Sequence, residues 1–178
     1  MLNLFEGWTV GNYLSLLSII PAMIGGFSAL GKLALSVKTK RAEFLLQLNS
    51  TIRSDKELAE IAYMIDYNRE WYSDEFHNKS GLEFSVDRYL SYIDYICYLK
   101  RLRHFSKKEL MFFQYRITRL LKSPSVRNYL WNLYHFSNKN QVCCSFMNLI
   151  EYGFKTGLID KLEFDDSTSN AYEKRLLF

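Results

Sequence analysis

Three side chains of one predicted helix could together bind and cleave a phosphodiester. Arg127 and Asn128 lie near the start of segment 124–137, and His135 follows Asn128 by seven residues, or two helical turns. Arginine binds phosphate oxygens with parallel N–H donors, and histidine can move a proton near neutral pH. Such a site could cleave RNA without a metal ion, with the ribose 2′-hydroxyl as nucleophile. The interpretation that we favour is a structural role for the three residues at an interface.

Other signals of catalysis are missing from the sequence. There is no Walker loop, no Rossmann glycine fingerprint, no Gly-x-Ser-x-Gly and no His-Glu-x-x-His. The cysteines, Cys97, Cys143 and Cys144, do not have the spacing of metal ligands. His77 falls in a predicted loop and His104 in a basic stretch, where histidines are ordinary surface residues. We therefore expect no metal, no cofactor and no enzymatic activity.

Charge is divided unevenly along the chain. Residues 42–99 carry eleven acids and five bases, whereas residues 100–127 carry nine bases and one acid. The basic stretch could bind nucleic acid, form a solvated face, or pair with acidic residues of a neighbouring subunit. We favour the neighbouring subunit and leave direct RNA binding open. The candidate residues of this basic face are Arg101, Arg103, Lys107, Lys108, Arg116, Arg119 and Lys122.

Helix-start signals divide the chain after residue 53 into successive helices. Ser-x-x-Glu occurs three times, and Ser123-Pro124 places proline at a first helical position. No stretch alternates with the period of two that is typical of a strand. The sequence predicts an all-α bundle over 54–157 and a tail over 158–178, with a short amphipathic end. The expected helices lie near 55–72, 82–103, 107–122, 124–137 and 140–156.

The N-terminal stretch has the length and polarity of a membrane span. No charged residue or histidine occurs from Gly7 to Gly31. A helix over about residues 8–31 rises roughly 36 Å, which exceeds the thickness of a bilayer's hydrocarbon core. Basic residues follow from Lys32 onward, so the positive-inside rule places the N-terminus outside and the rest in the cytoplasm. We expect a single-pass protein of the inner membrane whose transmembrane helix continues as a cytoplasmic extension to residue 53.

One face of this helix is small and polar. Its residues recur at intervals of three and four, with a polar neighbour at the edge of the same arc. Small residues allow close packing of membrane helices against other copies, and a ring of copies would instead turn this face toward water. Both alternatives imply a homo-oligomer within the lipid bilayer. The residues of this face, as a helix-packing or pore face, are Asn12, Ser15, Ser18, Ala22, Gly25, Ala29 and Lys32.

The stretch from Arg127-Asn128 to His135 resembles the motif of the HEPN superfamily, Arg-(Asn/His/Asp)-x4–6-His. That resemblance implies a compact helical bundle and, where the motif is active, a metal-independent ribonuclease. The size, single N-terminal span and HEPN-like domain are also similar to the small membrane accessory proteins of type VI-B CRISPR systems. This second resemblance implies a homo-oligomeric pore that is coupled to an RNA-guided, RNA-cleaving effector in antiviral defence. A broad group of bacterial membrane-anchored helical proteins is similar as well.

Three functions follow from these observations as hypotheses. The first, which we favour, is a membrane pore that permeabilises the membrane as an accessory to the CRISPR effector. The second is a membrane-tethered HEPN-type ribonuclease in which Arg127 holds the phosphate and His135 transfers the proton. The third is a non-enzymatic adaptor that is anchored in the membrane and recruits a partner through the basic face.

Overall fold

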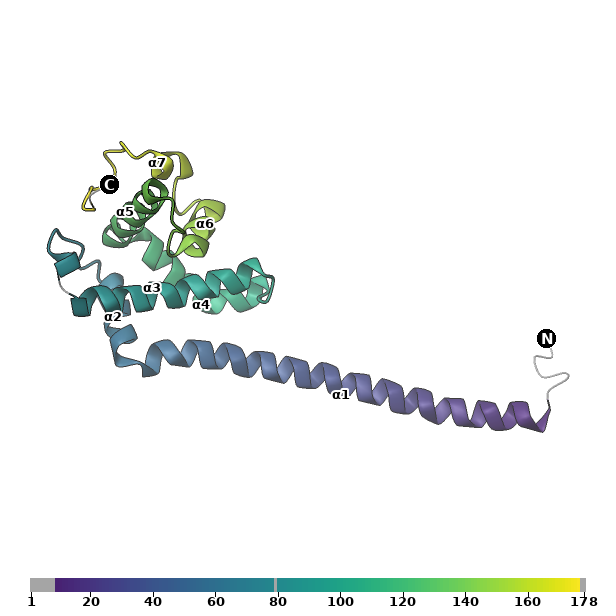
Figure 1. Ribbon diagram of the computed structural model, residues 1–178. Coiled ribbons are helices and arrows are strands. Elements are labelled where there is room, and N and C mark those ends of the chain that lie inside the picture. The colour runs from purple at the N-terminus through teal and green to yellow at the C-terminus, as the bar shows by residue number, and fades with distance from the viewer. Residues whose placement is uncertain (1–8, 79, 177–178) are drawn as a thin grey trace. The chain divides into compact units, whose positions relative to one another are not determined.

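All regular structure in the described part of the chain is helical, as the sequence predicts (Figure 1). The computed structural model describes residues 9–78 and 80–176, without the side chains of residues 12–14, 16, 18, 20–22, 24, 78 and 80. The α-helices are α1 (Val10–Ser54), α2 (Lys56–Asp66), α3 (Ser80–Arg101), α4 (Lys107–Lys122), α5 (Pro124–Asn140), α6 (Met147–Thr156) and α7 (Lys161–Asp165), and a 3₁₀ turn, η1, spans Phe76–Asn78.

The chain divides into two compact units, Met1–Gln47 and Leu48–Phe178, and α1 contributes residues to both. The predicted extension after the uncharged stretch is helical throughout, since α1 runs without a break to Ser54. Among the residues that the structure describes, no helix is both long enough and apolar enough to cross a membrane. The predicted span begins at about residue 8, which lies outside the described residues, and it includes several side chains that the structure does not describe.

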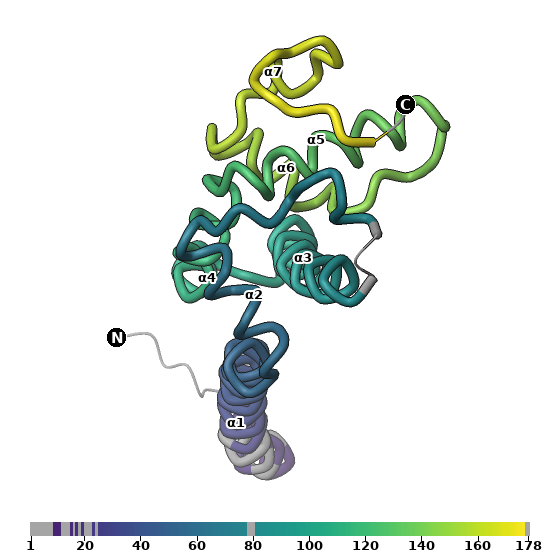
Figure 2. Tube along the Cα trace, turned by 90° about the vertical axis from the view of Figure 1, so that its left-hand side faces the viewer, coloured from purple at the N-terminus to yellow at the C-terminus, as the bar shows by residue number. Residues whose placement is uncertain are grey.

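The second unit is a bundle organised around α3. This helix packs against α2, η1 and α6, while α4 packs against α2 and α5 (Figure 2). One apolar stripe on each of α2, α3 and α4 is buried, because each helix turns that stripe toward the others. The side chains of the core with no exposed surface include Val86, Leu90, Ile93, Phe113, Ile117, Leu120, Leu130, Trp131, Leu149 and Ile150.

Two predicted helix starts are confirmed in detail. Ser106 and Glu109 form a reciprocal capping box at α4, with the Glu109 carboxylate accepting from the Ser106 N–H at 2.7 Å. Helix α5 begins at Pro124, as expected. Proline has no backbone N–H, and the N–H of the first helical residue has no partner within the helix. At α2 the cap is Asp55, one residue after Ser54, the serine of the first Ser-x-x-Glu signal, and the Asp55 carboxylate accepts from the Leu58 N–H at 3.2 Å. The reason is that α1 extends through Ser54.

The prediction of one helix over 140–156 is wrong. Helix α5 continues to Asn140, and Gln141 and Phe146 both have positive φ, which ends one helix and sets the start of the next. Helix α6 begins only at Met147, because Asp94 of α3 accepts a hydrogen bond from the Leu149 N–H at 2.8 Å. A half-buried carboxylate on another helix therefore fixes this boundary. Helix α7 was also not expected; Asp160 caps it by accepting from the backbone of residues 162 and 163.

Candidate functional site

The predicted packing or pore face lies on an exposed part of α1. Gly25, Ala29 and Lys32 are exposed, and the Ser15 hydroxyl donates to the Gly11 carbonyl at 2.9 Å. The side chains of Asn12, Ser18 and Ala22 lie outside the described residues. A methyl group added at Gly25 would meet no atom of the chain within 4 Å. The side chains that flank this face are large, apolar and more than half exposed: Leu17, Ile19, Met23, Phe27 and Leu30.

The HEPN-like residues all contact the C-terminal segment, residues 160–176. The Arg127 guanidinium donates to the Tyr172 hydroxyl at 3.1 Å and lies over the Tyr172 ring. The Asn128 side-chain oxygen accepts from the Glu173 N–H at 3.3 Å. His135 is buried, and its Nε2 lies 2.9 Å from the Phe164 carbonyl, to which a protonated nitrogen donates. The structure thus brings the three predicted residues to one face, where they hold the protein's own backbone and aromatic rings.

Sequence reasoning missed Asn132, which makes the most hydrogen bonds on this face of α5. The side chain is fully buried. Its amide donates to the Asn128 carbonyl at 2.8 Å and to the Glu173 carbonyl at 2.7 Å, and its oxygen accepts from the N–H groups of Arg175 and Leu176. The signal was present in the sequence, because Asn132 follows Asn128 by one turn and precedes His135 by another.

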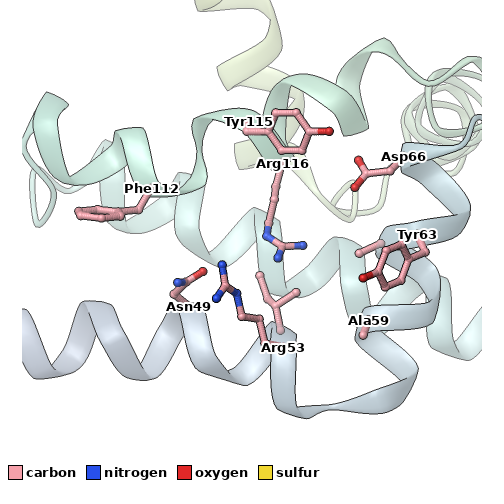
Figure 3. A pocket seen from close by; sticks show the side chains of 10 residues that line it. Asn49, Arg53, Ala59, Tyr63, Asp66, Phe112, Tyr115 and Arg116 are labelled. Carbon is pink, nitrogen blue, oxygen red and sulfur yellow. The ribbon is translucent and has the colours of Figure 1, made fainter.

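The basic face divides into paired and exposed residues. Arg101 forms an ion pair with Glu151 at 3.6 Å, and Arg119 pairs with Asp66 at 3.7 Å. The second pair joins the acidic and basic stretches within one chain, where we expected partners from another subunit. The remaining residues are exposed or line a pocket: Arg103, Lys107, Lys108 and Lys122 are exposed, and Arg116 lines a pocket together with Arg53 (Figure 3).

A second cluster of titratable groups surrounds the loop before α3. His77 is half-buried, with its Nδ1 2.8 Å from the Glu83 carboxylate, so its assignment as an ordinary surface residue is wrong. The Tyr129 hydroxyl donates to the Asp87 carboxylate at 2.6 Å. Burial raises the pKa of Asp87 above its ordinary value of 3.8, against the opposing effect of the Tyr129 hydrogen bond. The Asp87 carboxylate therefore takes up a proton at a higher pH than an ordinary aspartate does.

We expect Asp87→Asn to make the folded state less sensitive to pH. The raised pKa means that the folded protein binds this proton more tightly than the unfolded chain, so stability falls as pH rises from about 3.8 through the folded pKa. Asparagine keeps an acceptor for Tyr129 and has no charge to bury. Its stability relative to the wild type should therefore increase with pH, as measured by urea unfolding of the purified protein in detergent at several pH values.

Tyr129→Phe provides the opposing variant. It removes the hydrogen bond that lowers the pKa of Asp87, so stability should fall more steeply with pH than in the wild type. Equal pH dependence in the wild type and both variants would contradict the assignment to Asp87.

Comparison with known proteins adds no family to these sites, since the chain matches no protein-family model, no curated protein and no solved structure.

Proposed function

We propose that the protein assembles into a homo-oligomer in the bacterial inner membrane, with copies of α1 surrounding a pore. The observation that carries this proposal is the exposed apolar surface of α1. Five large apolar side chains between Leu17 and Leu30 are 52–70% exposed, within a stretch that contains no charged residue. Each gains about 1.5–3 kcal/mol on leaving water, so a hydrocarbon environment would favour this helix by an amount on the order of 10 kcal/mol.

The small face of α1 supports assembly in addition to anchoring. Gly25 and Ala29 are exposed and carry little or no side chain, which permits close approach of another helix. A helix that shares its polar face with other copies needs to be apolar only where it meets lipid. Lys32 and the bases after it favour the orientation with the bundle in the cytoplasm.

The proposed pore acts without catalysis. Arg127 and His135, the candidates for ribonuclease chemistry, are both engaged by the C-terminal segment, so their contacts favour the structural interpretation. Following the resemblance to CRISPR accessory proteins, we place the pore downstream of an RNA-guided, RNA-cleaving effector, whose activation would lead to permeabilisation of the infected cell's membrane.

The experiment is reconstitution of the full-length protein in liposomes. We expect a defined oligomer in detergent by light scattering and release of entrapped potassium after reconstitution. A stable monomer that leaves the liposomes tight would overturn the proposal. The coupling of the pore to an RNA-guided effector is tested in cells that express the protein together with an RNA-guided ribonuclease, by recording the membrane potential. We expect the membrane potential to be lost only when the target RNA is present.

A further inference from the structure

A pocket in the bundle unit is lined by two arginines and one aspartate. It lies between the last turns of α1, helix α2 and helix α4, and has a volume of about 660 Å³, within the range of small-molecule sites. Figure 3 shows the guanidinium groups of Arg53 and Arg116 turned into this pocket and toward each other, beside the amide of Asn49. These three residues form the polar part of the pocket.

The positive charges of Arg53 and Arg116 are not neutralised by the described part of the chain. Asp66 is the one carboxylate among the described residues that line the pocket, and it is paired with Arg119, which also donates to the Asp66 carbonyl. Neither Arg53 nor Arg116 forms an ion pair with any described residue. Two guanidinium groups that face one hollow repel each other, and an anion between them removes that repulsion and accepts their hydrogen bonds.

Arg116 is held in place for such a role. Its guanidinium lies close to the hydroxyl of Tyr89, whose side chain is buried in the bundle, and its positive charge lowers the pKa of that hydroxyl against the larger effect of burial. This contact fixes a guanidinium that would otherwise move freely, and it reduces the entropy lost on binding. Arg53, on the last turn of α1, is exposed and supplies the second donor group.

Aromatic side chains also line the pocket, on either side of the two arginines (Figure 3). Tyr63, Phe112 and Tyr115 line it, and each is more than 60% exposed although its ring is largely apolar. The Tyr63 ring is stacked on Tyr67 with centroids 6.4 Å apart, which holds it as a flat platform. Exposed aromatic rings beside arginines are typical of surfaces on which nucleobases stack while the phosphate is bound electrostatically.

We infer that this pocket binds a nucleotide, with the phosphate between Arg53 and Arg116 and the base on Tyr63. The ligand is a free mononucleotide or the phosphorylated end of a short RNA, since both present the same phosphate and base. Because Arg53 belongs to α1 and Arg116 to α4, the bound phosphate ties the last turn of α1 to α4. This inference does not depend on the pore, because it rests on residues of the bundle unit alone.

The test uses full-length protein in detergent and a fluorescent derivative of AMP, with binding measured by anisotropy. Unlabelled AMP, a 5′-phosphorylated short RNA, adenosine and inorganic phosphate serve as competitors. We expect AMP or the RNA to compete well, which distinguishes the two sources of the ligand, and adenosine to compete poorly. Inorganic phosphate that competes as well as AMP would overturn the assignment of a nucleotide, and so would stronger competition from micelles that contain phosphatidylglycerol.

Matched variants separate the pocket from general electrostatic attraction. Arg53→Gln and Arg116→Gln should each weaken binding of the AMP probe by about tenfold or more, because each removes a charged donor. Arg103→Gln removes the same charge from an exposed position outside the pocket and should leave binding unchanged. Equal loss in all three variants, or the absence of saturable binding in the wild type, would overturn the inference.

A fourth variant addresses the base. Tyr63→Leu removes the aromatic platform and keeps an apolar side chain, so binding of AMP should fall by about tenfold while competition by inorganic phosphate stays as in the wild type. Unfolding temperatures of the four variants close to that of the wild type exclude a general loss of folding. Unchanged binding of AMP in Tyr63→Leu would overturn the placement of the base.

Discussion

Gly25→Leu should convert the protein from an oligomer to a monomer and reduce potassium release from liposomes to the level of empty vesicles. A Cβ added at this position meets no atom within 4 Å outside the adjacent helix backbone, so a single copy has room for a larger side chain there. Leucine also favours a helix over glycine by about 1 kcal/mol. Any loss of assembly must therefore come from contact with another copy, where the larger side chain prevents close approach of the helices.

Gly31→Leu is the matched control. Gly31 lies on the same helix, and a Cβ there also meets no atom within 4 Å outside the adjacent helix backbone, but at 100° per residue it lies about 120° around the axis from Gly25, outside the small face. We expect this variant to assemble and to release potassium like the wild type. Ser15→Leu, on the same face as Gly25, should resemble Gly25→Leu. If Gly25→Leu and Ser15→Leu both assemble and conduct normally, the small face has no role in a pore.

Asn132→Leu should lower the free energy of unfolding by about 3 kcal/mol and expose the C-terminal segment to protease. Leucine fills the same space, but it leaves the Glu173 carbonyl and the N–H groups of Arg175 and Leu176 without their partner. A buried polar group that loses its hydrogen bond costs about 1–3 kcal/mol, and release of the segment into water limits the total. Urea unfolding gives the free energy, and trypsin digestion followed by mass spectrometry detects cleavage near Arg175.

The neighbouring Asn128→Ala separates this effect from a general disturbance of α5. Its side chain accepts one hydrogen bond, from Glu173 at 3.3 Å, so we expect a loss of less than about 1 kcal/mol and little new cleavage. Wild-type stability and protease resistance in Asn132→Leu would show that the hydrogen bonds of this side chain do not hold the segment.

Much of the fold follows from local signals in the sequence. The capping box at Ser106 and the proline at position 124 fix two helix starts through contacts within four residues, and such contacts are readable without a structure. The apolar stripes of α2, α3 and α4 predict their buried faces for the same reason. The start of α6 could not be predicted, because it depends on Asp94, which lies 55 residues before Leu149 in the chain.

In the candidate sites, too, contacts between residues that are far apart in the chain could not be predicted from the sequence. Arg127, Asn128 and His135 could be placed on one helical face, but their partner is a segment 29–45 residues away that no motif marks. A polar face on a helix predicts an interaction without identifying the other side. The pocket at Arg53 and Arg116 was missed because its two arginines come from different helices and are brought together only by the packing of the bundle.

The hydrogen bonds of Asn132 also set an order of events during synthesis. Its backbone partner Arg175 is made 43 residues later, which takes about 2–9 seconds at the usual rate of translation. During that time α5 presents an unsatisfied buried face, and the bundle cannot reach its final packing. Helix α1 precedes all of these residues in the chain, so it is available for insertion into a membrane before the domain that follows has closed.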